Sequence, residues 1–384
     1  MPRRLPPAGA AAVDSNRTLT AVKAPRGARA RERAVPLSAL LLAGVVCAAC
    51  SNGPGGSAAT GQTTSSTAAT TTNTTTTTTT TTLPPTTTTT LPLSLPAPAP
   101  IAAPAGDAAG AGQWTPSGRT VYGVPAVYET RLLPPGGSAD AGIAWMDAKL
   151  LTAQLYSGSR SPGGGPYQFT APIQPAQAAT LVAAFNGGFL MSAAGGGYYT
   201  EGRMIYPLVN GAASLVINAD GSVTVGAWGT DVSMTPGVVA VRQNLVPLVA
   251  GGQPTPQAAS PDWQAWGATC GPTSCSGAGI EAQWRSGAGV TANGALVYAA
   301  GPALTPLALA QLLVAAGVVR GMQLDINPDW PVFATYNPPA AGVSAGPSNG
   351  ASLQPSSVQG PATFFNPAWA RDFVTMSVRT LPAG

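Results

Sequence analysis

The sequence predicts an α+β fold, a strand-rich domain with a mixed sheet and few helices. The first observation is a series of short runs rich in Val, Tyr, Ile and Thr, broken by Gly, Asn and Pro, which is typical of strands. These runs cover residues 121–133, 142–158, 213–228 and 294–301. The second is a single clear helical pattern, at residues 305–317. Together they place the folded part at residues 114–384, a length that suits one large domain or two small ones.

Local signals support two of these elements. Asp220-Gly221 between two β-branched runs predicts a hairpin with a tight turn. Thr305 can cap the helix, Pro306 suits its first position and Gly317 suits its end. The helix is apolar nearly all round, which predicts a buried element. The order strand, helix, strand over residues 294–325 predicts a βαβ crossover that leaves Asp325 at the carboxyl end of a strand, where ligands of α/β sheets tend to bind.

The N-terminal 50 residues predict export. Residues 1–34 contain eight Lys or Arg against two acidic residues, so the rest of the chain has a net charge of −2 although the whole has +4. The alkaline balance therefore belongs to the leader and does not predict nucleic-acid binding. An apolar stretch too short for a comfortable membrane span follows and ends in small residues. Cys50 after Ala48 and Ala49 resembles a lipoprotein cleavage box, although Cys47 stands where that box prefers Leu or Val.

The predicted destination is extracytoplasmic, as a membrane-anchored lipoprotein or a secreted protein; an ordinary cleaved signal and an uncleaved anchor remain alternatives. Residues 51–113 are rich in Thr, Pro and Ala, including an unbroken Thr run at 74–82. With almost no large apolar residue this segment predicts a disordered stalk. Cys270 and Cys275 in an exported chain predict a small disulfide loop, since two sulfurs without histidine make a poor zinc site.

The absence of histidine excludes Ser-His-Asp and Cys-His catalysis and His-ligated metals. No nucleotide-binding loop is present. Three places join an apolar strand to polar groups, and each has a purely structural alternative. Asn186-Gly187-Gly188 follows a strand but also suits a simple turn; Arg285 suits an anion clamp or an exposed surface; Asp325 suits a site or an Asx turn before Pro328.

In order, these segments resemble the phosphodiester glycosidase domain family, which also occurs in bacterial envelope proteins. The resemblance rests on Asn186-Gly187-Gly188-Phe189, on Arg285-Ser286-Gly287-Ala288-Gly289 and on the strand, helix and strand that end at Asp325. It covers roughly residues 142–378 and implies that family's fold. After Asp325 the family has Gly-Gly-Gly-Ser, whereas this chain has Ile326, Asn327, Pro328 and Asp329. Pro328 has no N–H, so the family's backbone anion cradle must be altered here.

The resemblance implies hydrolysis of a sugar–phosphate diester in the cell envelope. In this interpretation Asp325 is the nucleophile, base or electrostatic stabiliser, Arg285 holds the departing phosphate and Asn186 positions a sugar hydroxyl, with Glu201 as a reserve carboxylate. Gly187, Gly188, Asn327 and Asp329 are candidate substrate contacts. A calcium or magnesium ion held by Asp325 and Asp329 is a further expectation. The alternatives are a non-catalytic glycan-binding lipoprotein and a structural envelope protein on a spacer.

Overall fold

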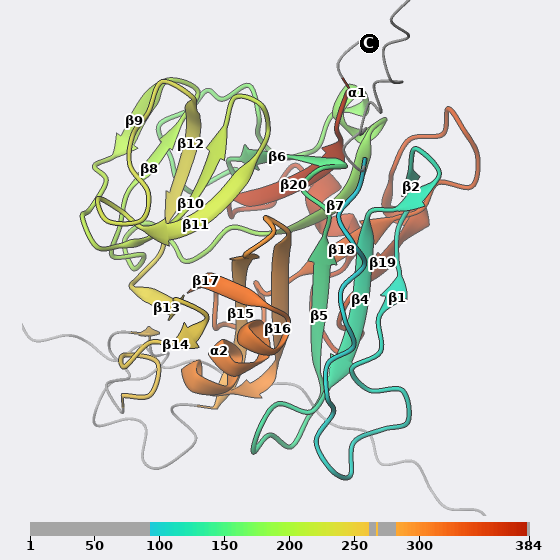
Figure 1. Ribbon diagram of the computed structural model, residues 1–384. Coiled ribbons are helices and arrows are strands. Elements are labelled where there is room, and N and C mark those ends of the chain that lie inside the picture. The colour runs from blue at the N-terminus through green and yellow to red at the C-terminus, as the bar shows by residue number, and fades with distance from the viewer. Residues whose placement is uncertain (1–92, 261–265, 268–281, 382–384) are drawn as a thin grey trace, which may run out of the picture. The chain divides into compact units, whose positions relative to one another are not determined.

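The computed structural model describes residues 93–260, 266–267 and 282–381 of the chain (Figure 1). These residues form a strand-rich domain of antiparallel sheets, which confirms the predicted fold class. The predicted leader, Cys50, most of the stalk and the pair Cys270 and Cys275 lie outside the described residues. Within the described part, no helix has the length and apolar character needed to cross a membrane.

The largest sheet has eight strands. Their spatial order is β1 (Thr115–Pro116), β4 (Val127–Leu132), β5 (Ala141–Met146), β16 (Leu296–Leu304), β15 (Gln283–Thr291), β17 (Val318–Gln323), β13 (Pro247–Ala250) and β14 (Gln253–Pro254). Each neighbouring pair is antiparallel. The sheet is therefore antiparallel rather than mixed, because β15 lies between the two strands of the predicted crossover, β16 and β17.

Two five-stranded sheets and a small ribbon complete the fold. One sheet has the order β11 (Val223–Ala227), β10 (Ala213–Asn218), β12 (Val238–Gln243), β8 (Tyr198–Thr200) and β9 (Arg203–Tyr206). The other has the order β19 (Gly350–Ser352), β18 (Phe333–Tyr336), β7 (Leu181–Asn186), β20 (Phe373–Val378) and β6 (Leu151–Tyr156). The ribbon pairs β2 (Thr120–Val121) with β3 (Val124–Pro125).

In the part of the chain that the structure describes, the helices are few and short. They are α1 (Pro175–Ala178), α2 (Pro306–Ala315) and the 3₁₀ turns η3 (Pro347–Asn349) and η4 (Pro361–Phe365). The expected signals of α2 are present: the Thr305 hydroxyl accepts the N–H of Ala308 at 3.0 Å, and Gly317 follows the helix with φ +84°. The helix lies against the eight-stranded sheet (Figure 1). Its apolar surface is buried there, as its sequence predicts.

The hydrophobic core has two main parts, one on each face of the eight-stranded sheet. One part unites Ala288 and Val290 of β15 with side chains of both five-stranded sheets, such as Leu215 and Phe185. The other packs α2 against the opposite face and includes Leu309, Leu313 and Trp145. This double burial follows from the alternation of side chains along each strand. The predicted hairpin is also confirmed, with β10 and β11 joined across Asp220-Gly221.

The folded domain begins earlier than the predicted boundary at residue 114. Leu95 and Ile101 are buried in the core beside α2. The N–H of Leu95 donates to Asp147 Oδ2 at 2.7 Å, and the indole N–H of Trp114 donates to the carbonyl of Ala99 at 2.8 Å. The predicted stalk is therefore corrected: residues 93–113 form a strap on the domain. Residues 93–113 have no strand pattern, so the sequence gives no sign that Leu95 and Ile101 are buried.

Removal of this strap should destabilise the domain. A chain that begins at residue 114 loses the burial of Leu95 and Ile101, whereas one that begins at residue 93 keeps it. We expect the shorter chain to have a free energy of unfolding lower by about 3–6 kcal/mol, the scale of two buried aliphatic side chains. Urea denaturation of the two chains measures this difference. Equal denaturation midpoints would contradict the assignment of the strap to the domain.

Candidate functional site

Asp325 lies two residues beyond the end of β17 and is almost completely buried, with 1% of its surface exposed. Its backbone continues the pairing with β15, because the N–H of Ser286 donates to the carbonyl of Asp325 at 2.8 Å. Its Oδ1 accepts the N–H groups of Ile326 at 2.8 Å and Asn327 at 3.0 Å. One carboxylate oxygen therefore forms the Asx turn that the sequence allows.

The second oxygen of Asp325 faces a cation instead. Its Oδ2 lies 3.7 Å from Nη1 of Arg371 and accepts no hydrogen bond from any described residue. The guanidinium carbon of Arg371 lies 4.4 Å from the ring centroid of Trp330, a cation–π contact. The Oδ2–Nη1 distance is too long for a direct hydrogen bond, so the two charges face each other across a gap. Asp325 thus serves the turn with one oxygen and presents the other to Arg371.

Burial dominates the electrostatics of this pair. It raises the pKa of Asp325 to about 6, although Arg371 and the N–H groups of Asn327 and Ile326 act in the opposite direction. Burial also lowers the pKa of Arg371 below its usual range. The cause is the same for both groups, since the charged form of each loses its contact with water. Asp325 therefore titrates near neutral pH.

Asn186, at the end of β7, is connected to Asp325 through one hydroxyl group. Its Nδ2 donates to Ser286 Oγ at 3.1 Å, and the same Oγ accepts the N–H of Asp325 at 3.1 Å. Its Oδ1 accepts the hydroxyl of Tyr298 at 2.8 Å and the N–H of Val332 at 3.2 Å. Asn186 therefore positions the backbone at Asp325, through Ser286, and at Val332.

Gly187 and Gly188 pack against a buried ion pair. Arg242 Nε lies 2.7 Å from Asp372 Oδ2, and both side chains are excluded from solvent. A Cβ at Gly187 would lie 2.1 Å from Asp372 Oδ2, and one at Gly188 would lie 2.9 Å from Arg242 Nη2. Gly188 also has φ +155°, which disfavours other residues. The glycines are therefore required by this close approach, and the N–H of Gly187 is used by the carbonyl of Asp372 at 2.9 Å.

The expected position of Arg285 is wrong. Its side chain lies on the opposite face of β15 from Ser286, because successive residues of a strand alternate. There its Nε donates to the carbonyl of Leu304 at 2.7 Å and its Nη1 to Gln323 Oε1 at 2.7 Å. It lines a cavity of about 230 Å³ with Thr305 and Pro306, at the start of α2. The cation that faces Asp325 is Arg371.

Glu201, the expected reserve carboxylate, fixes a loop. Its two oxygens accept the N–H groups of Gln168 at 3.0 Å and Phe169 at 2.9 Å. Its backbone has φ +50°, and Arg203 lies 3.8 Å from its carboxylate. None of these contacts involves Asp325 or Arg371. Glu201 is therefore assigned to the loop it fixes rather than to the cluster around Asp325.

Asn327 and Asp329 continue the turn after Asp325. Asn327 Oδ1 accepts the N–H of Asp329 at 3.0 Å, and the Asp329 side chain is exposed. Across the described residues, no group of three or more His, Cys, Asp or Glu side chains is placed to hold a metal ion. The expected calcium or magnesium ion between Asp325 and Asp329 stays a prediction.

The sequence reasoning missed Arg371 and Trp330 and gave Asp372 no role. The sequence does contain a signal for Arg371 and Asp372, because this charged pair stands directly before the apolar strand β20 in a chain with few charges. Asp325 is a candidate on sequence because it directly follows an apolar strand. The same criterion applied to the start of a strand finds Arg371 and Asp372. No comparable pattern marks Trp330.

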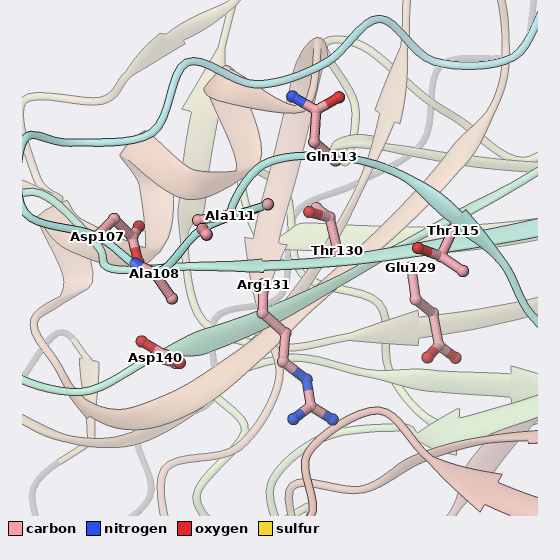
Figure 2. Close-up of a pocket in the computed structure, with 11 residues that line it drawn as sticks. Asp107, Ala108, Ala111, Gln113, Thr115, Glu129, Thr130, Arg131 and Asp140 are labelled. Atoms are coloured by element: carbon pink, nitrogen blue, oxygen red, sulfur yellow. The ribbon is translucent and has the colours of Figure 1, made fainter.

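A separate hollow lies where the N-terminal strap crosses β4, and it contains none of the predicted site residues. Figure 2 shows Gln113 of the strap above Thr130 and Asp107 and Ala111 to the left of Thr130, with the side chains of Glu129 and Arg131 pointing downward. Its volume is about 380 Å³. Burial raises the pKa of Glu129. Asp107 Oδ2 accepts the N–H of Leu133 at 2.8 Å, so this carboxylate holds the strap in place.

No protein-family model and no curated protein sequence matches the chain. Three solved structures show a distant similarity. The first is the catalytic domain of zebrafish N-acetylglucosamine-1-phosphodiester alpha-N-acetylglucosaminidase, auto-inhibited by its pro-peptide, with TM-score 0.38 and 14% identity over 70% of this chain and 88% of that chain.

The other two are bacterial. A hypothetical protein from Synechocystis has TM-score 0.36 and 11% identity over 69% of this chain and 64% of that one. A protein of Burkholderia pseudomallei K96243 that is considered to be exported has TM-score 0.31 and 11% identity over 66% of this chain and 75% of that one. The chain is thus similar to a phosphodiester glycosidase domain and to bacterial proteins, at low identity.

The raised pKa of Asp325 should be visible in the pH dependence of stability. An aspartate titrates near pH ~3.9 in an unfolded chain, and the folded pKa is about 6. Since folding favours the protonated form, Asp325 adds stability that is complete below pH ~4 and is lost as the pH rises through about 6. Asp325→Asn cannot titrate. Its free energy of unfolding relative to the wild type should therefore rise by about 2–3 kcal/mol between pH ~4 and pH ~7.

Urea denaturation at several pH values measures this change. Asp231→Asn is a matched control, because Asp231 only accepts the N–H of Ala227 in an exposed turn. A constant difference between Asp325→Asn and the wild type across this pH range would show that the carboxyl keeps its ordinary pKa.

Proposed function

We propose that the protein hydrolyses a glycosidic phosphodiester in the cell envelope, with Asp325 and Arg371 as its reacting-site groups. One observation carries the proposal: a buried carboxylate oxygen without a hydrogen bond from the described residues faces a guanidinium group at 3.7 Å. Buried charges are normally satisfied by direct hydrogen bonds, so such a pair is unusual in a purely structural role. The ordered motifs that resemble the phosphodiester glycosidase domain supply the reaction class.

The reaction needs a carboxylate and a cation. Cleavage breaks the bond between the anomeric carbon and a phosphate oxygen, and the electron pair leaves with the phosphate. The oxygen of a water molecule forms the new bond to the carbon, and its proton must be removed. A phosphate is a good leaving group and needs little help from a general acid. The protein must chiefly stabilise positive charge on the sugar and hold the departing phosphate.

Asp325 fits the first task. Near neutral pH most of a carboxyl group with a pKa of about 6 is ionised, so it can stabilise a cationic sugar and accept the proton of the attacking water. Its backbone is held on one side by Ser286 and Asn186, and its Oδ1 is fixed by two N–H groups. Such fixation places Oδ2 in one direction, which is the geometry that electrostatic catalysis requires.

Arg371 is assigned to hold the departing phosphate, in place of Arg285, the residue expected from the sequence. Its planar guanidinium group can bind a phosphate through two parallel N–H groups. Trp330 lies under this group and Gly188 offers its carbonyl to Nη1 at 3.5 Å, so the orientation of Arg371 is constrained.

The envelope location is also part of the proposal. It is supported by the Arg-rich leader, the short apolar stretch and the Thr-rich stalk. We propose that the mature chain begins at a lipid-modified Cys50 and that the stalk holds the domain away from the membrane. A non-catalytic glycan-binding lipoprotein remains the second candidate, supported by Pro328 in place of a glycine-rich anion cradle.

Asp325→Asn should abolish most of the activity without unfolding the protein. The amide keeps the shape and the Asx-turn acceptor but can no longer ionise. We expect kcat on a synthetic sugar-1-phosphodiester to fall by about 10²-fold or more, the scale of a lost acid–base or electrostatic group. Asp231→Asn should retain full activity. Wild-type turnover equal to that of Asp325→Asn would reject the catalytic assignment, and glycan binding without any turnover would favour the non-catalytic candidate.

Arg371→Ala tests the phosphate-binding role separately. Loss of the guanidinium group should lower kcat/KM by about 10²-fold or more, because a charge-assisted contact to the departing phosphate is removed. Free guanidinium at millimolar concentration should restore part of the rate, since it can occupy the vacated space. Lack of rescue together with an unchanged KM would place Arg371 in a structural role beside Asp325.

A further inference from the structure

A second hollow lies between the edge strand β6 and one end of the sheet that contains β8, β10 and β12. Asp325 is not among the residues that line it. The volume of this hollow is about 810 Å³. The walls come from β6, the segment at Gln168 and Phe169, the β8–β9 turn, the β10–β11 hairpin and the start of β12. A hollow of this size can hold several sugar units or a short peptide.

Hydrogen bonds within and between the wall segments fix the shape of this groove. The carboxylate of Glu201 accepts the N–H groups of Gln168 and Phe169, which fixes the β8–β9 turn to the loop that forms the opposite wall. Asp220 Oδ1 accepts the N–H of Ser222 at 2.9 Å and fixes the hairpin. The segments that form the groove are therefore positioned before any ligand binds, which lowers the entropy cost of binding.

The charge of the lining disfavours anions. Two carboxylates, Glu201 and Asp220, border the groove, and no Lys or Arg is among the described residues that line it. Arg203 contacts Glu201 at 3.8 Å but is not part of the lining. A phosphate group would meet negative charge here, in contrast to the environment of Arg371.

Some of the remaining polar groups of the lining are neutral and unused, whereas Thr152 Oγ1, Gln154 Nε2 and Asn218 Nδ2 already donate within the protein. The hydroxyl of Tyr199, the side-chain amide of Gln168 and Oε1 of Gln154 make no hydrogen bond with any described residue. Phe169 and Tyr199 add aromatic surface to the same lining. Amides and hydroxyls that donate and accept, set beside aromatic rings, match the hydroxyl groups and apolar faces of uncharged sugars.

A peptide strand fits less well. An extended peptide would have to pair with the free edge of β6. That edge is already used at both ends: the N–H of Ala153 donates to Gly221 at 2.8 Å, and the N–H of Ser157 donates to Phe169 at 2.9 Å. Only Gln154–Tyr156 remain between these bonds. A strand of typical length has about five or six residues, so an added peptide would pair over only part of its length here.

We propose that this groove binds an uncharged segment of a glycan chain. None of its lining residues belongs to the cluster of Asp325, Arg371 and Trp330. The groove can therefore bind glycan whether or not the protein is a hydrolase. If no glycan binds in the groove, the proposed reaction at Asp325 is unaffected.

The test uses the full exported chain and a panel of neutral oligosaccharides of about four to six units of glucose, galactose, mannose or N-acetylglucosamine. Binding is measured by titration calorimetry and by saturation-transfer NMR. At least one series should bind with a Kd of about 1 mM or tighter. The pair of substitutions Gln168→Ala and Tyr199→Phe should weaken that binding by about 10-fold, since both remove neutral hydrogen-bonding groups.

Controls separate this groove from other surfaces. Gln113→Ala, in the hollow of Figure 2, should leave the affinity unchanged, and the Tm of each variant reports its folding. The proposal is overturned if no oligosaccharide binds up to about 10 mM, or if binding survives in the Gln168 and Tyr199 variant. Tighter binding of a penta-lysine peptide, lost in that same variant, would also overturn it and assign the groove to cationic ligands.

Discussion

The buried ion pair between Arg242 and Asp372 organises the region around Asp325. It joins β12 of one five-stranded sheet to the start of β20 in the other. Arg242 also donates to the carbonyl of Phe189, which fixes the loop after β7. Loss of one partner from such a pair leaves an uncompensated charge, at a cost of about 3–5 kcal/mol. The glycines at 187 and 188 are needed because any side chain there would displace one of these two charges.

The position of Arg371 follows from this pair. Asp372 pairs with Arg242, and Arg371 directly precedes it in the chain. Arg371 Nη1 lies 3.5 Å from the carbonyl of Gly188, beside this pair, and 3.7 Å from Asp325 Oδ2. Asn244 supports the backbone just before Asp325, because its Nδ2 donates to the carbonyls of Gln323 and Leu324 at 2.9 Å each. A structural ion pair and its neighbours thus bring a carboxylate and a guanidinium group face to face.

Local signals in the sequence were sufficient for the elements but not for the pairing of distant groups. The cap at Thr305, the stop at Gly317 and the turn at Asp220-Gly221 depend on residues close in sequence, and the structure has them as predicted. The side to which Arg285 points depends on which face of β15 meets α2, and a run of small residues does not encode that face. Arg371 stands directly before β20, and β20 is placed by its pairing with β7, a contact between segments that lie about half the chain apart. The strap was missed because two aliphatic residues separated by Pro and Ala show no period.

The environment of Asp325 also explains how a chain without histidine can carry a group that titrates near neutral pH. An exposed aspartate is ionised at any pH above ~5 and would hold its proton too weakly to exchange it in that range. Burial raises the pKa of Asp325 to about 6, close to that of an ordinary imidazole at ~6.5. Arg371 limits the rise, because a nearby positive charge favours the ionised carboxylate. Without Arg371 the carboxyl would be more nearly neutral, and without burial it would be permanently charged. The pair therefore places a carboxylic acid in the titration range that histidine supplies in most proteins.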